Sequence, residues 1–301
     1  MGEMHSRVEV AAVSKSFGGR QVVKDVSFSV QAGEVLGLVG SNGAGKTTTI
    51  RMMLDIVRPD SGSVRLFGLP SSDAAKSRIG YLPEDRGLYR SLSVWDTLVY
   101  LASLKGVPPP EASRRAAALL ERVGLLVHKG KKVAELSRGM SQLLQFAATI
   151  LHQPDLVILD EPFAALDPLN VRLMKELAAE ERRRGAAFVL STHQMGQVEE
   201  LCDQVVMIDG GHVVLSGSLR DIRMKFSDHA VNVVCAHLPG DVPGVRSVQD
   251  AGTHRHLVLD PGVQPQDVLR TLLDLGVPID RFEIALPTME DVFVRVARRA
   301  S

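Results

Sequence analysis

The chain has 301 residues, a length that suggests about two domains and supports a hydrophobic core without disulfide or metal support. Its 35 basic and 35 acidic side chains give zero formal net charge, which argues against a whole-protein electrostatic affinity for nucleic acid or anionic lipid. Cys202 and Cys235 lie far apart and exclude a disulfide framework or a cysteine-rich zinc site. No run reaches the roughly 18 consecutive apolar residues of a membrane span, so we expect a soluble, cytoplasmic protein.

The first elements are mostly short strands. In chain order we expect strands Val8–Val13, Val22–Val30 and Val35–Val39, helix Lys46–Val57 and strand Ser63–Phe67. Gly18-Gly19 marks a turn between the first two strands, and Pro59 stops the helix. The run Val35–Val39 is mostly apolar, which is typical of a strand buried on both faces.

The middle of the chain is richer in helix and then alternates. Helical periodicity is found in Leu98–Leu104, Glu111–Val123, Ser141–Leu151, Asn170–Arg184 and Gln197–Leu201. Strand patterns return at Leu156–Leu159, Ala187–Leu190, Val205–Ile208 and Val213–Ser216. Strands alternating with helices indicate parallel βαβ units, and so an α/β fold.

The pattern changes after Lys225. Strands are expected at Ala230–Ala236, His256–Leu259 and Phe282–Leu286, and helices at Gln266–Leu275 and Thr288–Arg299. Thr288 and Asp291 have the spacing of a capping box at the start of the last helix. We therefore expect a small accessory α+β domain at 226–301, in which no chemistry is evident.

A glycine-rich loop joins the strand Val35–Val39 to the helix that begins at Lys46. Its residues, Gly40, Ser41, Asn42, Gly43, Ala44, Gly45, Lys46 and Thr47, fit the P-loop pattern GxxxxGK[ST] in the strand–helix context that the pattern requires. The glycines allow backbone N–H groups to approach phosphate oxygens, and the helix N-terminus favours an anion. Lys46 would contact the β- and γ-phosphates, and the Thr47 hydroxyl would bind Mg²⁺.

Two carboxylates end the strand Leu156–Leu159. Asp160 and Glu161 would therefore lie at the carboxyl edge of the sheet, where open α/β sheets bind ligands. Asp160 can hold Mg²⁺, and Glu161 can polarise an attacking water. Acidic strand ends are common, so this pair indicates a site only together with the P-loop.

With these motifs in order, the segment from Val8 to Lys225 resembles the ATP-binding subunit of an ABC transporter. Leu136–Met140 resembles the signature loop of that family, with Ser137, Arg138 and Gly139 as candidate ATP contacts from a second subunit. Ala165-Leu166-Asp167 resembles its D-loop, and His193 resembles its switch histidine, although a lone histidine is more often structural. Phe17 stands where the family has an aromatic that stacks on adenine; a core phenylalanine is the alternative.

The resemblance implies a P-loop NTPase fold, with a RecA-like core, an antiparallel β subdomain and a helical lobe at about 85–150, within an ATPase domain at 1–225. It implies ATP and Mg²⁺ as ligands. ATP would contact Phe17, residues 40–48 including Thr48, and the signature loop. The metal ligands would be Thr47, Asp160 and Glu84, and the catalytic residues Lys46, Glu161 and His193.

Two positions depart from the family pattern. The family usually has Gln where this chain has Glu84, which adds a negative charge near the phosphates and could alter metal affinity. The signature loop has Arg138 where Gly is usual and Met140 where Gln is usual. These departures, with the run 81–89 and the tail Pro287–Phe293, resemble a subgroup of prokaryotic exporter ATPases with a short C-terminal extension.

We therefore expect an ATP hydrolase that acts as a homodimer and drives export through a separate membrane permease, peripheral to the cell membrane. An apolar stretch after Glu84 is a candidate groove for a permease helix, or else lobe core: Leu88, Tyr89, Leu92, Val94 and Trp95. The transported substrate cannot be read, because its pocket belongs to another chain.

Two other classes of function are alternatives. A soluble ABC ATPase acting on nucleic acid or ribosomes usually carries two ATPase units or a long coiled-coil insertion, and neither is present here. A non-catalytic nucleotide-gated module is disfavoured by Glu161 and His193, although Glu84 keeps it open.

Overall fold

The computed structural model describes residues 6–70, 72–85, 87–164 and 166–300, with side chains described as far as 296. Its contacts divide the chain into two compact units, Met1–Gly217 and Ser218–Ser301. The sequence predicts a boundary after residue 225, but the contacts place helix α8 (Leu219–Lys225) in the second unit. None of the helices in the described part is long and apolar enough to cross a bilayer.

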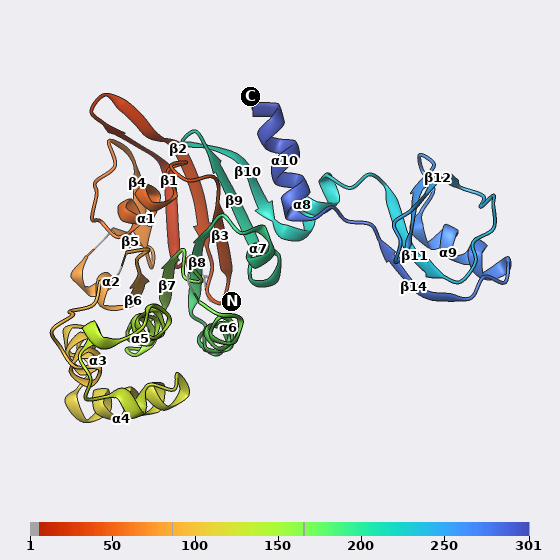
Figure 1. The fold of residues 1–301 in the computed structure, drawn as a ribbon. Helices are drawn as coiled ribbons and strands as arrows, with labels where there is room; N and C mark the ends of the chain where they lie inside the picture. Colours follow the sequence, from red (N-terminus) through yellow and green to blue (C-terminus); the bar gives the residue numbers. More distant parts are fainter. Residues whose placement is uncertain (1–5, 71, 86, 165, 301) are drawn as a thin grey trace, which may run out of the picture. The chain divides into compact units, whose positions relative to one another are not determined.

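The first unit contains two sheets (Figure 1). One is antiparallel in the order β2-β1-β4-β5, with strands β1 (Val8–Phe17), β2 (Arg20–Val30), β4 (Ser61–Leu66) and β5 (Leu69–Pro70). The other has the order β10-β9-β3-β8-β7-β6, with strands β3 (Val35–Val39), β6 (Ile79–Leu82), β7 (Leu156–Asp160), β8 (Ala187–Thr192), β9 (Gln204–Asp209) and β10 (His212–Ser218). The strands from β9 to β6 pair in parallel, as the βαβ pattern predicts.

Helices cover this framework. They are α1 (Lys46–Met53), α2 (Asp73–Ser77), α3 (Val94–Leu104), α4 (Pro109–Arg122), α5 (Arg138–Ile150), α6 (Pro168–Arg183) and α7 (Met195–Leu201), with short 3₁₀ turns at Leu126–His128 and Val133–Glu135. Figure 1 shows α3, α4 and α5 together as a lobe, and α5 contacts β6. One core runs between the two sheets and α1, and it includes Val8, Val26, Leu38 and Ile50, all of them buried.

The helix predicted at Lys46–Val57 is shorter than expected and ends at Met53. Asp55 has a φ of 55°, and the amides of Ile56 and Val57 both donate to the Arg51 carbonyl. The chain therefore turns back before Pro59 can stop the helix, because a left-handed residue closes the helix end first.

The second unit is an α+β fold. Its sheet has the order β12-β13-β11-β14, with strands β11 (Ala230–Cys235), β12 (Val245–Asp250), β13 (Arg255–Leu259) and β14 (Ile279–Ile284). Helix α9 (Pro265–Asp274) packs Val268 and Leu272 onto Val231 and Leu257 of the sheet. Helix α10 (Met289–Ala300) is capped as its spacing predicts, because Thr288 Oγ1 accepts from the Asp291 amide at 3.1 Å.

Candidate functional site

The loop between β3 and α1 requires glycine at two points. Gly40 has a φ of 154°, and a Cβ there would lie 2.1 Å from the Ile208 carbonyl oxygen. Gly45, the N-cap of α1, has a φ of 111°, and a Cβ there would lie 2.9 Å from the Val22 carbonyl oxygen. Because the loop passes so close to β2 and β9, its backbone is held rigidly. The N–H groups of the first turn of α1, which have no intrahelical acceptor, stay available for an anion.

Lys46 lies at the centre of this loop. Its Nζ donates to the carbonyl oxygens of Gly40 at 2.8 Å and of Ser41 at 3.1 Å. Burial lowers the pKa of the Lys46 ammonium, and the charges of Glu161, Asp160 and Glu84 oppose that change. The buried cation therefore faces a set of carboxylates rather than a single ion-pair partner.

These groups line one cavity of about 380 Å³. Nine of the residues that the sequence predicted for the nucleotide and its metal line it: Asn42, Gly43, Gly45, Lys46, Thr47, Thr48, Glu84, Asp160 and Glu161. Val22 completes the lining and was not predicted, because it lies on a strand outside every motif. Gly40, Ser41 and Ala44 belong to the same loop but do not line the cavity.

Asp160, at the end of β7, has one satisfied and one unsatisfied carboxylate oxygen. The residue is only 1 % exposed, and its Oδ1 accepts from the Ser191 hydroxyl at 2.5 Å. Its Oδ2 is buried and has no hydrogen-bond partner among the described residues. A buried orphan oxygen beside a threonine hydroxyl is the donor set that a hard divalent cation takes, so these residues fit Mg²⁺.

Glu161 follows in a strained conformation. Its φ of 49° is unusual for a residue with a side chain, and its amide donates to the Ser191 carbonyl at 3.1 Å. Its Oε1 lies 2.8 Å from His193 Nδ1, which comes from the loop after β8. The Glu161 carboxylate thus lines the cavity and lies within hydrogen-bonding distance of the imidazole.

Ser191 is a residue that the motifs missed as a support for Asp160. It stands in register with Asp160, because β7 and β8 pair in parallel. The motifs in the sequence give Ser191 no role of its own. Asp160 could be identified as the hydrogen-bond partner of Ser191 only once the order of the strands was known.

The signature loop does not line this cavity. Ser137 caps α5, with its Oγ accepting from the Met140 amide at 3.3 Å, and Arg138 is exposed. A Cβ at Gly139 would lie 3.7 Å from Leu166 Cδ2, so this loop lies beside the D-loop. In the D-loop, Asp167 caps α6 by accepting from the Asn170 amide, while Ala165 lies outside the described residues.

Phe17 is not a core residue. Its side chain is 50 % exposed at the end of β1, and the Lys15 ammonium lies 5.6 Å from the ring centre. The core alternative is therefore wrong. Its role in adenine stacking stays a prediction, because the ring does not line the cavity.

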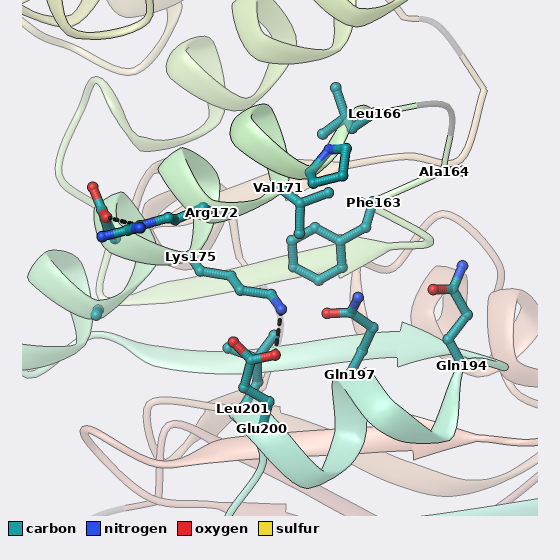
Figure 2. A pocket seen from close by; sticks show the side chains of 13 residues that line it. Phe163, Ala164, Leu166, Val171, Arg172, Lys175, Gln194, Gln197, Glu200 and Leu201 are labelled. Atoms are coloured by element: carbon teal, nitrogen blue, oxygen red, sulfur yellow. Dashed lines mark hydrogen bonds and ion pairs between the residues drawn. The ribbon is translucent and has the colours of Figure 1, made fainter.

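A larger hollow, of about 930 Å³, lies between α6 and α7 (Figure 2). Lys175 reaches into it but is paired with Glu200 at 2.6 Å, and its Nζ lies 5.6 Å from the centre of the Phe163 ring. None of the residues of the phosphate loop lines it. The chemistry for a triphosphate therefore lies in the smaller cavity.

A glycine loop between a buried strand and a helix, with carboxylates at the end of a nearby strand in the same sheet, defines a P-loop nucleotide-binding protein. The comparisons identify the family. The ABC transporter family model matches residues 23–164, and the model of the C-terminal domain of DrrA1-3-like ATP-binding proteins matches residues 217–297. The chain belongs to the ABC transporter ATP-binding proteins, which are ATPases.

Individual relatives agree over most of the chain. The uncharacterized ABC transporter ATP-binding protein YhaQ of Bacillus subtilis is 36% identical over 288 residues, covering 94% of this chain and 95% of YhaQ. The Nod factor export ATP-binding protein I of Burkholderia lata is 36% identical over 214 residues, covering 70% of each chain.

A solved structure described as the ATP-binding subunit of an ABC transporter has a TM-score of 0.70 and 33% identity. The match covers 73% of this chain and 93% of the chain in the solved structure. These likenesses confirm the predicted fold class, a P-loop NTPase with a C-terminal α+β addition.

Proposed function

We propose that this ATPase powers the export of a substrate through a separate membrane permease, and that it works as a homodimer with Mg²⁺. The observation that carries the proposal is the cavity beside α1. There a buried ammonium, an unsatisfied carboxylate oxygen and a strained carboxylate held by an imidazole face one space. This set matches what transfer of a phosphoryl group to water needs.

The phosphate loop supplies binding. The free N–H groups at the start of α1 and the Lys46 ammonium would contact the β- and γ-phosphates, because both present positive charge to the cavity. Lys46 is already held by the carbonyls of Gly40 and Ser41, so its charge is in place before the nucleotide arrives. Little reorganisation is then needed on binding.

The carboxylates supply the remaining chemistry. Asp160 Oδ2, the Thr47 hydroxyl and the Glu84 carboxylate would hold Mg²⁺, which supplies neutralisation of charge on the transferred phosphoryl group when bound. Glu161 would orient and polarise the attacking water. His193 Nδ1 holds Glu161 from outside the cavity, where the half-exposed ring can respond to a γ-phosphate.

The homodimer is supported by the position of the signature loop, which does not line the cavity of its own chain. Ser137, Arg138 and Gly139 do not line the cavity of their own chain, although Ser137 caps α5 and leaves that helix N-terminus free for an anion. A second copy placed head to tail would bring its α5 N-terminus to the open side of the phosphates. Two nucleotides would then be bound between the two subunits.

The permease is proposed to dock beside α3. A hollow of about 550 Å³ there is lined by Tyr89, Leu92 and Tyr100, and the two rings meet edge to face at 5.7 Å between centres. Val94, which the sequence offered either for this groove or for the core of the lobe, is wholly buried and belongs to the core. Tyr89 is 52 % exposed and available to a partner helix, which would place the chain at the cytoplasmic face of the membrane.

The experiment is ATP-dependent dimerisation, measured by light scattering with the Glu161→Gln variant. We expect a monomer without nucleotide and a stable dimer with MgATP. The direction of transport is tested by reconstituting the chain with a membrane permease that co-purifies with it and supplying ATP on the side of this subunit. Movement of substrate toward that side would overturn export, while a permanent monomer that hydrolyses ATP would overturn the dimer.

A further inference from the structure

Strand β6 is the edge strand of its sheet, the last in the order β10-β9-β3-β8-β7-β6. Among the residues that the structure describes, β7 is the one strand that pairs with it. The carbonyl groups of Ile79 and Tyr81 on the other side would remain unpaired, or would recruit a foreign strand, unless something else satisfied them. In this chain side chains from the helical lobe take that place.

Two side chains donate hydrogen bonds to the Ile79 carbonyl oxygen. Lys105, just after α3, donates from Nζ to the carbonyl oxygen of Ile79 at 3.0 Å and to that of Lys76 at 2.7 Å. His152, just after α5, places Nε2 3.1 Å from the same Ile79 oxygen. Burial, with the Lys105 charge, lowers the pKa of His152 to about 4, so the ring is neutral and Nε2–H donates.

Lys105 has no ion-pair partner among the described residues. Because this half-buried ammonium donates only to carbonyl oxygens among the described residues, its removal would leave both carbonyls without that donor. Helix α5 also presses on β6 directly, since a Cβ at Gly80 would lie 2.3 Å from the Thr149 carbonyl oxygen. The strand is therefore held by polar contacts and by a close backbone approach.

The segment that follows β6 borders a cavity of about 240 Å³, lined by Pro83 and Leu88 on one side and by Leu101 and Leu104 of α3 on the other. The helical lobe holds this segment on both sides of Glu84. Lys105 and His152 contact the Ile79 carbonyl before it, and the Asp85 carbonyl after it accepts from Gln145 Nε2 of α5 at 3.4 Å. Glu84 itself lines the nucleotide cavity.

We propose that Lys105 and His152 are positioning residues, which fix the open edge of β6 and thereby set the position of Glu84 at the nucleotide cavity. Helix α5 begins at the signature loop and ends beside Lys105 and His152, the pair that we call the clamp. The inference rests on the proposed role of Glu84 toward MgATP.

The first test needs no activity. Lys105→Met keeps the length of the side chain and removes its charge and both hydrogen bonds, and Lys131→Met makes the same change at an exposed lysine of the same lobe. In the nucleotide-free protein, we expect amide hydrogen exchange of a peptide spanning 79–89 to speed up by about tenfold in Lys105→Met only. Equal exchange in the two variants overturns the proposal.

The second test asks whether Lys105 acts through Glu84. The Mg²⁺ concentration that gives half-maximal turnover is measured for wild type, Lys105→Met, Glu84→Gln and the double variant. We expect Lys105→Met to raise it by about tenfold in the wild-type background and to add nothing in the Glu84→Gln background. Additive changes overturn the link, because a general loss of stability does not depend on Glu84.

His152→Leu is the second variant, in case Lys105→Met does not fold. It removes one of the two donors to Ile79, so both readouts should change in the same direction by a smaller factor. An unchanged exchange rate overturns the proposal. If the wild type hydrolyses no ATP, the proposed function fails by itself, and the exchange measurement still decides whether the clamp holds β6.

Discussion

The nucleotide cavity and the C-terminal unit differ in whether their polar groups have hydrogen-bond partners within the fold. In the cavity, Asp160 Oδ2 is buried without a described partner, and Glu161 is held in a strained conformation. In the C-terminal unit, Arg295 forms a two-pronged ion pair with Asp228 at 2.9 and 3.0 Å, and His256 pairs with Asn232 at 2.9 Å. The cavity thus holds an unsatisfied oxygen and a strained residue where chemistry is proposed, whereas these polar groups of the C-terminal unit are satisfied within the fold.

This contrast predicts where substitutions should change activity and where they should change only stability. A group left unsatisfied in the free protein is available for a ligand, so its removal should reduce binding or turnover. A group that is paired within the fold, and neither lines the cavity nor holds a residue that does, stabilises the folded state, and its removal should lower stability alone.

The largest effect is expected for Glu161→Gln. The amide keeps the size of the side chain and can still accept from His193, but it cannot polarise water, so turnover should fall by about 10³-fold or more while ATP binding remains. Steady-state hydrolysis and binding of a fluorescent ATP analogue measure the two effects. Glu176→Gln, an exposed change on α6, is the matched control, and wild-type turnover in Glu161→Gln would remove this residue from its role.

The next effect is expected for Lys46→Ala. Because the ammonium is buried and faces the cavity, its loss should weaken ATP binding by about 10- to 100-fold, the range for a hydrogen bond to a charged group. Titration calorimetry gives the affinity, and Lys131→Ala shows what loss of an exposed lysine does. An unchanged affinity contradicts the proposed phosphate cradle.

Local motifs explain how much of the site could be predicted. Gly40 to Thr47 and the pair Asp160-Glu161 are contiguous, and their spacing alone carries the chemistry. Ser191 could not be assigned to Asp160, because the two are 31 positions apart and meet only through the order of the strands. The same reason hid Lys105, whose partners are backbone carbonyls that no side-chain pattern reveals.

The fold was predictable where apolar residues recur regularly. Strand β3 and helix α9 follow from their patterns, whereas β12 was missed because its side chains are mostly exposed and leave no alternation to read. Strand β6 was missed for a related reason: it is four residues long and has glycine in its second position. Tertiary contacts decide such segments.

A smaller effect is expected for Ser191→Ala, which sharpens the contrast inside the cavity. The hydroxyl holds Asp160 Oδ1, so without it the carboxylate loses its orientation while the negative charge remains. We expect about a tenfold rise in the Mg²⁺ needed for half-maximal turnover, with ATP binding in the absence of metal unchanged. Thr192→Ser changes the neighbouring buried position without touching Asp160, and an equal response in the two variants would place the effect in the strand instead.

The smallest effect is expected for Arg295→Met in the C-terminal unit. The ion pair is partly exposed, so its loss should lower the melting temperature by about 1–4 °C and leave ATP turnover unchanged. The Arg295 guanidinium lowers the pKa of Asp228 below its usual value of 3.8, so this stabilisation is present above that value and is lost as the pH falls through the folded-state pKa. Calorimetry at pH 7 and near pH 3 should therefore find that the difference between wild type and variant shrinks in acid. A change in turnover at pH 7 would instead give this unit a part in the ATPase cycle, and the contrast between the two regions would fail.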